Sequence, residues 1–181
     1  MTLAEVFDTC KEIELRHAKL YATFSLSLGK VDERVARFWE QMSAEEWQHY
    51  ILVDFGRSVC ARTVGLKMPA KELPPVSIHE LTAALDRYEQ RVEEQEITLN
   101  EAFEMAIAIE CSEADAVYMY LLSTMRRAIE RSNETFLLER IAHVARDMHA
   151  HVDRLIDAVK RFANDPDLVR QAYVLKELHK H

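Results

Sequence analysis

The chain is poor in the two residues that most often reverse a backbone. Its 181 residues include three glycines and four prolines, and neither type occurs between Pro75 and Pro166. Sandwiches and barrels need many tight turns, and those turns depend on glycine and proline. The sequence therefore excludes an all-β fold. It predicts an all-α chain of long helices, folded as a single domain over residues 1–181.

Helix-start signals divide the chain into six predicted helices. In a capping box, a hydroxyl side chain and a glutamate three residues later satisfy each other's backbone N–H groups. Such boxes occur at Thr2 with Glu5, Ser77 with Glu80, and Thr98 with Glu101. Asp32 and Asp165 are further cap candidates. The predicted helices cover residues 3–28, 33–63, 78–95, 99–131, 134–163 and 166–179.

The lengths of the connections predict how these helices are arranged. Short connections near 29–31 and 132–133 predict two antiparallel helix hairpins. The connection over about 64–98 is long and contains the predicted helix 78–95. This combination is typical of a four-helix bundle with one long crossover. The last predicted helix, 166–179, is a short C-terminal addition to that bundle.

Charge and cysteine content exclude several classes of function. The chain has 31 acidic and 23 basic residues, a net charge of −8, which disfavours binding to nucleic acid. We find no apolar run long enough to span a bilayer and no signal-peptide pattern at the start. The three cysteines are odd in number, far apart and form no CxxC pair. These features predict a cytoplasmic protein without a membrane or nucleic-acid partner.

Each long predicted helix carries an ionisable residue where its apolar stripe calls for a core side chain. A lone buried carboxylate costs several kcal/mol, and a bound dication removes that penalty. Carboxylates combined with a few histidines suit iron or manganese better than a thiolate-bound zinc. The sequence therefore predicts a metal site in the helix interior, with six candidate ligands: Glu14, Glu46, His49, Glu110, Glu113 and His151.

Counting residues from the predicted turns indicates which ligands share a level. Glu14 lies fifteen residues before Gly29 and Glu46 fifteen after Val31, so these two should face each other. In the second hairpin, Glu113 lies nineteen residues before Ser132 and His151 eighteen after Asn133. Glu110, twenty-two residues before Ser132, matches the level of His151 less well.

These motifs resemble the ferritin-like superfamily and, within it, the rubrerythrin-type di-iron proteins. The residues that carry the resemblance are Glu14 with Tyr21, Glu46-Trp-Gln-His49, and Glu110-Cys-Ser-Glu113 with Tyr118. The resemblance implies a ferritin-like bundle with a di-iron site and a peroxidase-type or ferroxidase-type oxidoreductase activity. Metal ions and small oxidants are then the partners. Because no four-cysteine rubredoxin module is present, the electron donor is external. Wide helix faces also favour a homo-oligomer such as a dimer.

One departure from the family pattern leaves alternatives open. The family has a second Glu-x-x-His in the last bundle helix, but Met148 stands three residues before His151. Either Glu113 compensates for the glutamate that Met148 replaces, or one metal position is lost and the site is mononuclear or absent. Whether His17 or Asp147 joins the site is also open. The alternative function is a non-enzymatic helical-bundle scaffold or interaction protein that has lost part of the metal site.

Overall fold

The described part of the chain is built from helices. The computed structural model describes residues 1–30, 32–71, 73, 78–94, 96–112, 114–132 and 135–178, without the side chains of 114–115, 132, 135–137, 140–149, 176 and 178. Within these residues there are seven helices and no strand, which confirms the all-α prediction. They are α1 (Leu3–Leu28), α2 (Glu33–Thr63), α3 (Ile78–Glu94), α4 (Leu99–Glu110), α5 (Ala114–Ser132), α6 (Thr135–Phe162) and α7 (Pro166–Leu178). No helix among the described residues has an apolar stretch sufficient to cross a bilayer.

Helix α1 is fixed at its start both by its own cap and by the chain that follows α2. The predicted capping box is present, because Thr2 accepts from the Glu5 N–H and Glu5 accepts from the Thr2 N–H. In addition, the Leu3 N–H donates to the Met68 carbonyl at 2.8 Å. The first N–H groups of a helix have no partner within the helix, so these bonds satisfy groups that would otherwise need water.

Helix α2 begins and ends at the predicted residues. The Asp32 side chain accepts from the Arg34 N–H at 2.8 Å, which caps the first turn. At the other end, Gly65 adopts a φ of 85° and its N–H donates to the Cys60 carbonyl at 2.9 Å. Glycine adopts this left-handed conformation without the steric cost that a side chain brings, so it stops the helix.

The predicted helix 99–131 is wrong, because the structure contains two helices in its place. Helix α4 ends at Glu110, where the Cys111 N–H donates to the Ile107 carbonyl. The Ser112 N–H then donates to the Ile109 carbonyl at 2.9 Å, which tightens the turn so that the helix cannot continue. Only a weak sequence signal marked this position, namely Ser112 followed three residues later by Asp115.

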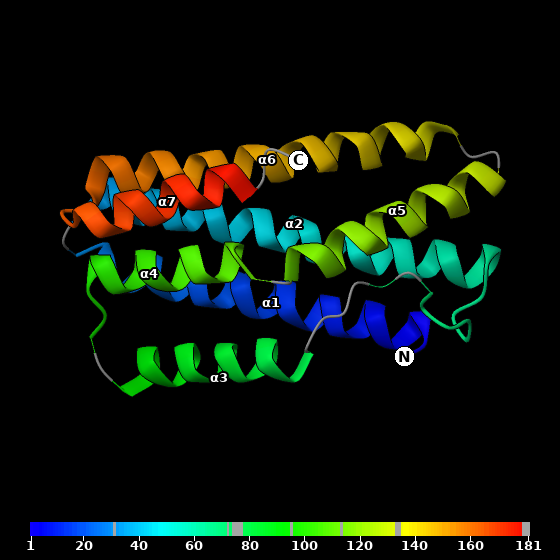
Figure 1. Ribbon diagram of the computed structural model, residues 1–181, viewed down its shortest axis with the longest axis horizontal. Coiled ribbons are helices and arrows are strands. Elements are labelled where there is room, and N and C mark those ends of the chain that lie inside the picture. Colours follow the sequence, from blue (N-terminus) through cyan, green and yellow to red (C-terminus); the bar gives the residue numbers. More distant parts are fainter. Residues whose placement is uncertain are drawn as a thin grey trace.

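Helices α1, α2 and α6 run side by side, and α4 and α5 follow one another along the same length (Figure 1). Helix α3 lies against α1 on the outside, and α7 packs on α4 and α6. Of the other predicted start signals, the capping box of Thr98 with Glu101 is present, and the Asp165 side chain accepts from the Asp167 N–H. Ser77 lies outside the described residues.

The apolar core consists of two clusters with a polar layer between them. One cluster is rich in aromatic rings and includes Tyr21, Phe24 and Trp39. The other includes Phe7 and Met125. Along α1 and α2, the two clusters occupy opposite halves of each helix, and the buried ionisable residues lie where they meet. The fold therefore encloses these polar groups between two dry regions.

Candidate metal centre

Six ionisable side chains converge in the layer between the two apolar clusters. Each sits on the inner stripe of its helix because it is spaced three or four residues from core positions. Each is at most 6% exposed to solvent. Helix α1 contributes two of them, α2 two, and α4 and α6 one each: Glu14 and His17, Glu46 and His49, Glu110, and His151. Five of these six are residues that the sequence proposed as ligands.

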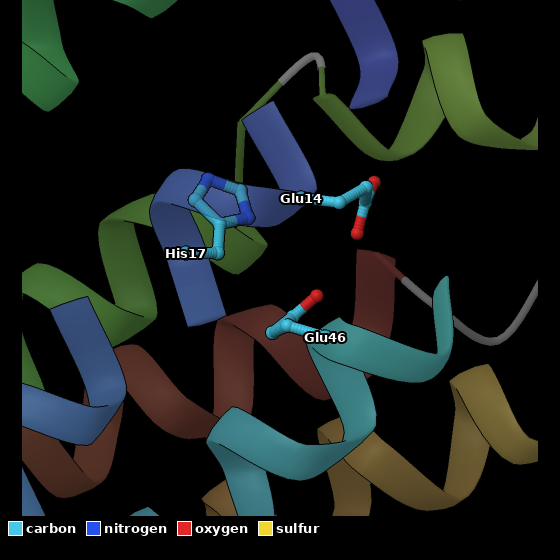
Figure 2. A group of neighbouring side chains, drawn as sticks. All are labelled: Glu14, His17 and Glu46. Atoms are coloured by element: carbon cyan, nitrogen blue, oxygen red, sulfur yellow. The ribbon is translucent and has the colours of Figure 1, made fainter. Parts of the chain in front are cut away.

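The first group of possible ligand atoms joins α1 to α2. Atoms of Glu14, His17 and Glu46 that can bind a metal all lie within 4.8 Å of one another. Figure 2 shows the Glu46 carboxylate pointing from α2 toward the space between the Glu14 and His17 side chains on α1. The depth match that the sequence predicted for Glu14 and Glu46 is therefore present in the structure.

The second group shares Glu46 with the first and adds α4 and α6. Glu46, Glu110 and His151 also offer atoms within 4.8 Å of one another. The Nε2 atom of His151 lies 3.0 Å from Oε1 of Glu110 and 3.2 Å from Oε1 of Glu46. Glu46 is thus the one residue that both groups contain among the described residues.

His49 faces the other oxygen of the shared carboxylate. Its Nδ1 atom lies 3.0 Å from Oε2 of Glu46 and 3.4 Å from Oε2 of Glu14. Its ring packs against the ring of Tyr118 with centroids 5.0 Å apart. The two oxygens of Glu46 therefore point to different histidines, one from α2 and one from α6.

A second layer of contacts holds these side chains in place. The Tyr21 hydroxyl donates to Oε1 of Glu110 at 2.9 Å. The Nδ1 atom of His151 lies 2.7 Å from Oε2 of Glu45, whose other oxygen pairs with Arg154 at 2.6 Å. A carboxylate on one ring nitrogen fixes the orientation of the imidazole and leaves the other nitrogen for a ligand.

Burial and mutual contact shift the pKa values of the cluster strongly. Burial raises the pKa of Glu14 to about 8, against the opposing effect of its hydrogen bond with His49. Burial alone lowers the pKa of His49, but its hydrogen bonds with Glu14 and Glu46 outweigh this and raise it to about 10. For His151, the effect of burial is likewise exceeded by the nearby charges of Glu110 and Glu46, which raise its pKa well above the usual value.

Two other shifts have the opposite direction. Burial would raise the pKa of Glu46, but the charge and hydrogen bond of His151 and the hydrogen bond of His49 hold it well below its usual value. Burial lowers the pKa of His17, and the charges of Glu46 and Glu110 only partly oppose this. Glu46 is therefore ionised at neutral pH, and His17 is a neutral imidazole, the form that binds metals.

This arrangement neutralises its own charge with protons when no cation is bound. Protonated His49 and His151 balance ionised carboxylates, and Glu14 retains its proton at neutral pH. A dication replaces these protons, because carboxylates and imidazoles bind metal in their deprotonated forms. These buried groups could hold a metal ion.

The second hairpin differs from the level that residue counting favoured. Glu110 contacts His151, although residue counting placed Glu110 at a level that matched His151 less well than Glu113. Glu113 and the side chains of Asp147 and Met148 lie outside the described residues.

Two further residues of the buried layer, His17 and Glu45, were not among the six predicted ligands. His17 stands three residues after Glu14, the same spacing that singled out Glu46 with His49, so the signal was present. Glu45 lies on the same helix as Glu46, but its contact with His151 joins residues 106 positions apart. Local periodicity gives no information about such a contact.

Comparison of the chain with protein-family models, with curated proteins and with solved structures finds no match.

Proposed function

We propose that this protein is a ferritin-like metalloprotein that holds non-haem iron as a di-iron site between α1, α2, α4 and α6. The observation that carries the proposal is the shared carboxylate of Glu46, which belongs to both ligand groups. A carboxylate in this position would serve as a ligand in both groups. In the proposal, Glu14 and His17 complete one metal position, and Glu110 and His151 complete the other.

The ferritin-like bundle is part of the same proposal. Helices α1, α2, α6 and the consecutive pair α4 and α5 supply its four positions, with α3 in the crossover and α7 added at the end. His49 adjoins both metal positions through Glu14 and Glu46. By the resemblance, Glu113 adds a further carboxylate from the segment after α4.

Bound iron would supply electron transfer to a small oxidant, so the expected reaction is reduction of peroxide or dioxygen, or oxidation of ferrous iron. Manganese suits the same ligands. The chain itself positions the ligands: the Tyr21 hydroxyl holds Glu110, and Glu45 holds His151. The two apolar clusters exclude bulk water from the site. Electrons come from a separate donor.

Metal analysis of the protein purified without chelator, after growth with added iron, tests this proposal. We expect about two metal ions per chain, since enclosed carboxylate sites retain metal. The variant Glu46→Gln should lose most of both ions because it alters the shared ligand. The matched control Glu12→Gln, an exposed position on α1, should keep them. Less than about 0.2 metal per chain in the wild type would contradict the proposal.

One observation favours a different function, that of a non-enzymatic helical scaffold or interaction protein. His49 and His151 each lie 3.0 Å from a buried carboxylate oxygen, and such contacts raise the pKa of both histidines, so protonated imidazoles can offset the carboxylate charge in place of a metal. Thermal unfolding with and without ferrous iron under anaerobic conditions separates the two functions. A metal at a hundred times its dissociation constant adds about 2.7 kcal/mol to stability, a shift of several degrees. An unchanged melting temperature favours the scaffold.

A further inference from the structure

Helix α2 exposes three large apolar side chains on the face that points away from the core. Trp47 is 43% exposed, Ile51 62% and Phe55 45%. Steps of four residues keep them on one side of the helix. Glu46 and His49, which belong to the buried cluster, lie on the opposite side of α2. The apolar face is therefore separate from the candidate metal centre.

These three residues are the middle of a longer outward line. At about 100° per residue, nine exposed positions of α2 fall within an arc of roughly 80° centred on Ile51. Two of them, Glu33 and Arg37, lie in the first turns of α2 and form an ion pair with each other, so the other seven are treated as one set. We call this set the outer stripe: Glu40, Ala44, Trp47, Ile51, Phe55, Ser58 and Arg62.

The outer stripe is symmetric about Ile51 in both spacing and chemistry. Trp47 and Phe55, both aromatic, stand four residues before and after it. At seven residues stand Ala44 and Ser58, which are both small. At eleven residues the pair is Glu40 and Arg62, which carry opposite charges. A surface whose two halves complement each other in this way fits a second copy of itself related by a two-fold axis.

We propose that the outer stripe is the contact between two copies of this chain, which pair their α2 helices antiparallel about a two-fold axis at Ile51. In this arrangement Trp47 packs on Phe55 of the partner subunit. Small residues meet where Ala44 faces Ser58 of the partner subunit, which lets the helices approach closely. Every contact occurs twice because the axis exchanges the copies.

The charges at the two ends of the stripe fix the direction of pairing. Antiparallel pairing places each Glu40 beside Arg62 of the partner subunit, whereas parallel pairing places like charges together. The neighbouring charges are already satisfied within one chain, since Asp54 pairs with Lys11 and Asp8 with Arg57. A single pair of helices buries less than a large permanent interface does, so we expect a reversible dimer with a Kd on the order of 10 µM.

Sedimentation equilibrium of the full chain tests the contact. The wild type should dimerise, and Ile51→Glu should raise Kd more than about 100-fold because two glutamates meet at the axis. Val174→Glu on α7 is the matched control, because Val174 is 59% exposed and similar in chemistry, and it should dimerise like the wild type. Circular dichroism shows that each variant is folded. A monomeric wild type, or a dimer that Ile51→Glu leaves intact, overturns the proposal.

Charge reversal tests the direction of pairing. Glu40→Arg alone places two arginines together at each end, and Arg62→Glu alone places two glutamates together, so each should raise Kd about tenfold, or about 1.4 kcal/mol. An equal mixture of the two variants restores opposite charges at both ends and should associate as tightly as the wild type. A mixture that associates no better than either variant alone overturns the antiparallel arrangement.

Discussion

The stability of the metal-free protein should fall as the pH rises from 7 to 9, because the buried cluster holds protons that the unfolded chain releases. Burial raises the pKa of Glu14 from 4.5 to about 8. Although burial lowers the pKa of His49, hydrogen bonds with Glu14 and Glu46 raise it from 6.5 to about 10. In both cases the folded-state pKa exceeds the unfolded one. The stabilisation from each group is therefore complete below its unfolded-state pKa. It is lost as the pH rises through the folded-state pKa, about 8 for Glu14 and about 10 for His49.

The shifts of Glu14 and His49 give a lower bound to this effect, because the raised pKa of His151 adds a loss of the same sign. Between pH 7 and 9, Glu14 loses roughly 1 kcal/mol of stabilisation and His49 roughly 2–3 kcal/mol, at 1.36 kcal/mol for each proton and pH unit. Together these losses amount to a few kcal/mol, a large part of the roughly 5–15 kcal/mol by which a domain of this size is stable. His17 has little effect in this window, because its lowered pKa matters only below about 6.5.

Urea unfolding at pH 7, 8 and 9 with a chelator present measures this dependence. Glu14→Gln and His49→Gln should each flatten the curve, since each removes one of the two groups. The exposed Glu12→Gln should leave the curve as in the wild type. Added manganese should reduce the loss at pH 9, because the ligands are then already deprotonated. A wild-type change below about 1 kcal/mol, or a rise in stability with pH, would refute the assignment of these protons.

Three further predictions concern the supports of the site and the fold. Glu45→Gln removes the charged acceptor of the His151 ring, so metal affinity should fall about tenfold in competition with a chelator; an unchanged affinity would show that this contact does not orient the ring. Gly56→Ala places a Cβ 2.2 Å from the Met125 sulfur and should lower the free energy of unfolding in urea by about 1–3 kcal/mol. The double variant with Met125→Ala should lose less stability than the two single variants combined. Additive losses would contradict the contact. Thr98→Ala removes the α4 cap and should lower the free energy of unfolding by about 1 kcal/mol, or the Tm by roughly 2–4 °C. Thr98→Ser should keep the cap and the wild-type Tm. Equal Tm values for the two variants would show that the cap is not important.

Local signals in the sequence were sufficient to predict the α1–α2 hairpin. Thr2 and Asp32 mark the two helix starts, and both side chains make the expected capping bonds. The burial of Glu14 and Glu46 could also be predicted, because each interrupts an otherwise apolar stripe. Their meeting at one level followed from counting along two regular helices joined by a short turn, where little error accumulates.

The second half of the site was less predictable because it depends on an irregular turn and on distant contacts. The turn after Glu110 contains neither glycine nor proline, so composition gave no warning of it. This turn interrupts the regular helical rise on which the level count relied, and the structure places Glu110 against His151. The contact of Glu45 with His151 depends on how α2 and α6 pack, which periodicity within either helix does not determine.

The end of α4 at Glu110 has an electrostatic consequence for the buried layer. The aligned peptide dipoles of a helix place about half a negative elementary charge at its C-terminus. A continuous helix would carry that partial charge far away, but the turn at Cys111 brings it beside a carboxylate that is 4% exposed. Backbone and side chain then both contribute negative potential at one point, which favours a cation at this helix end.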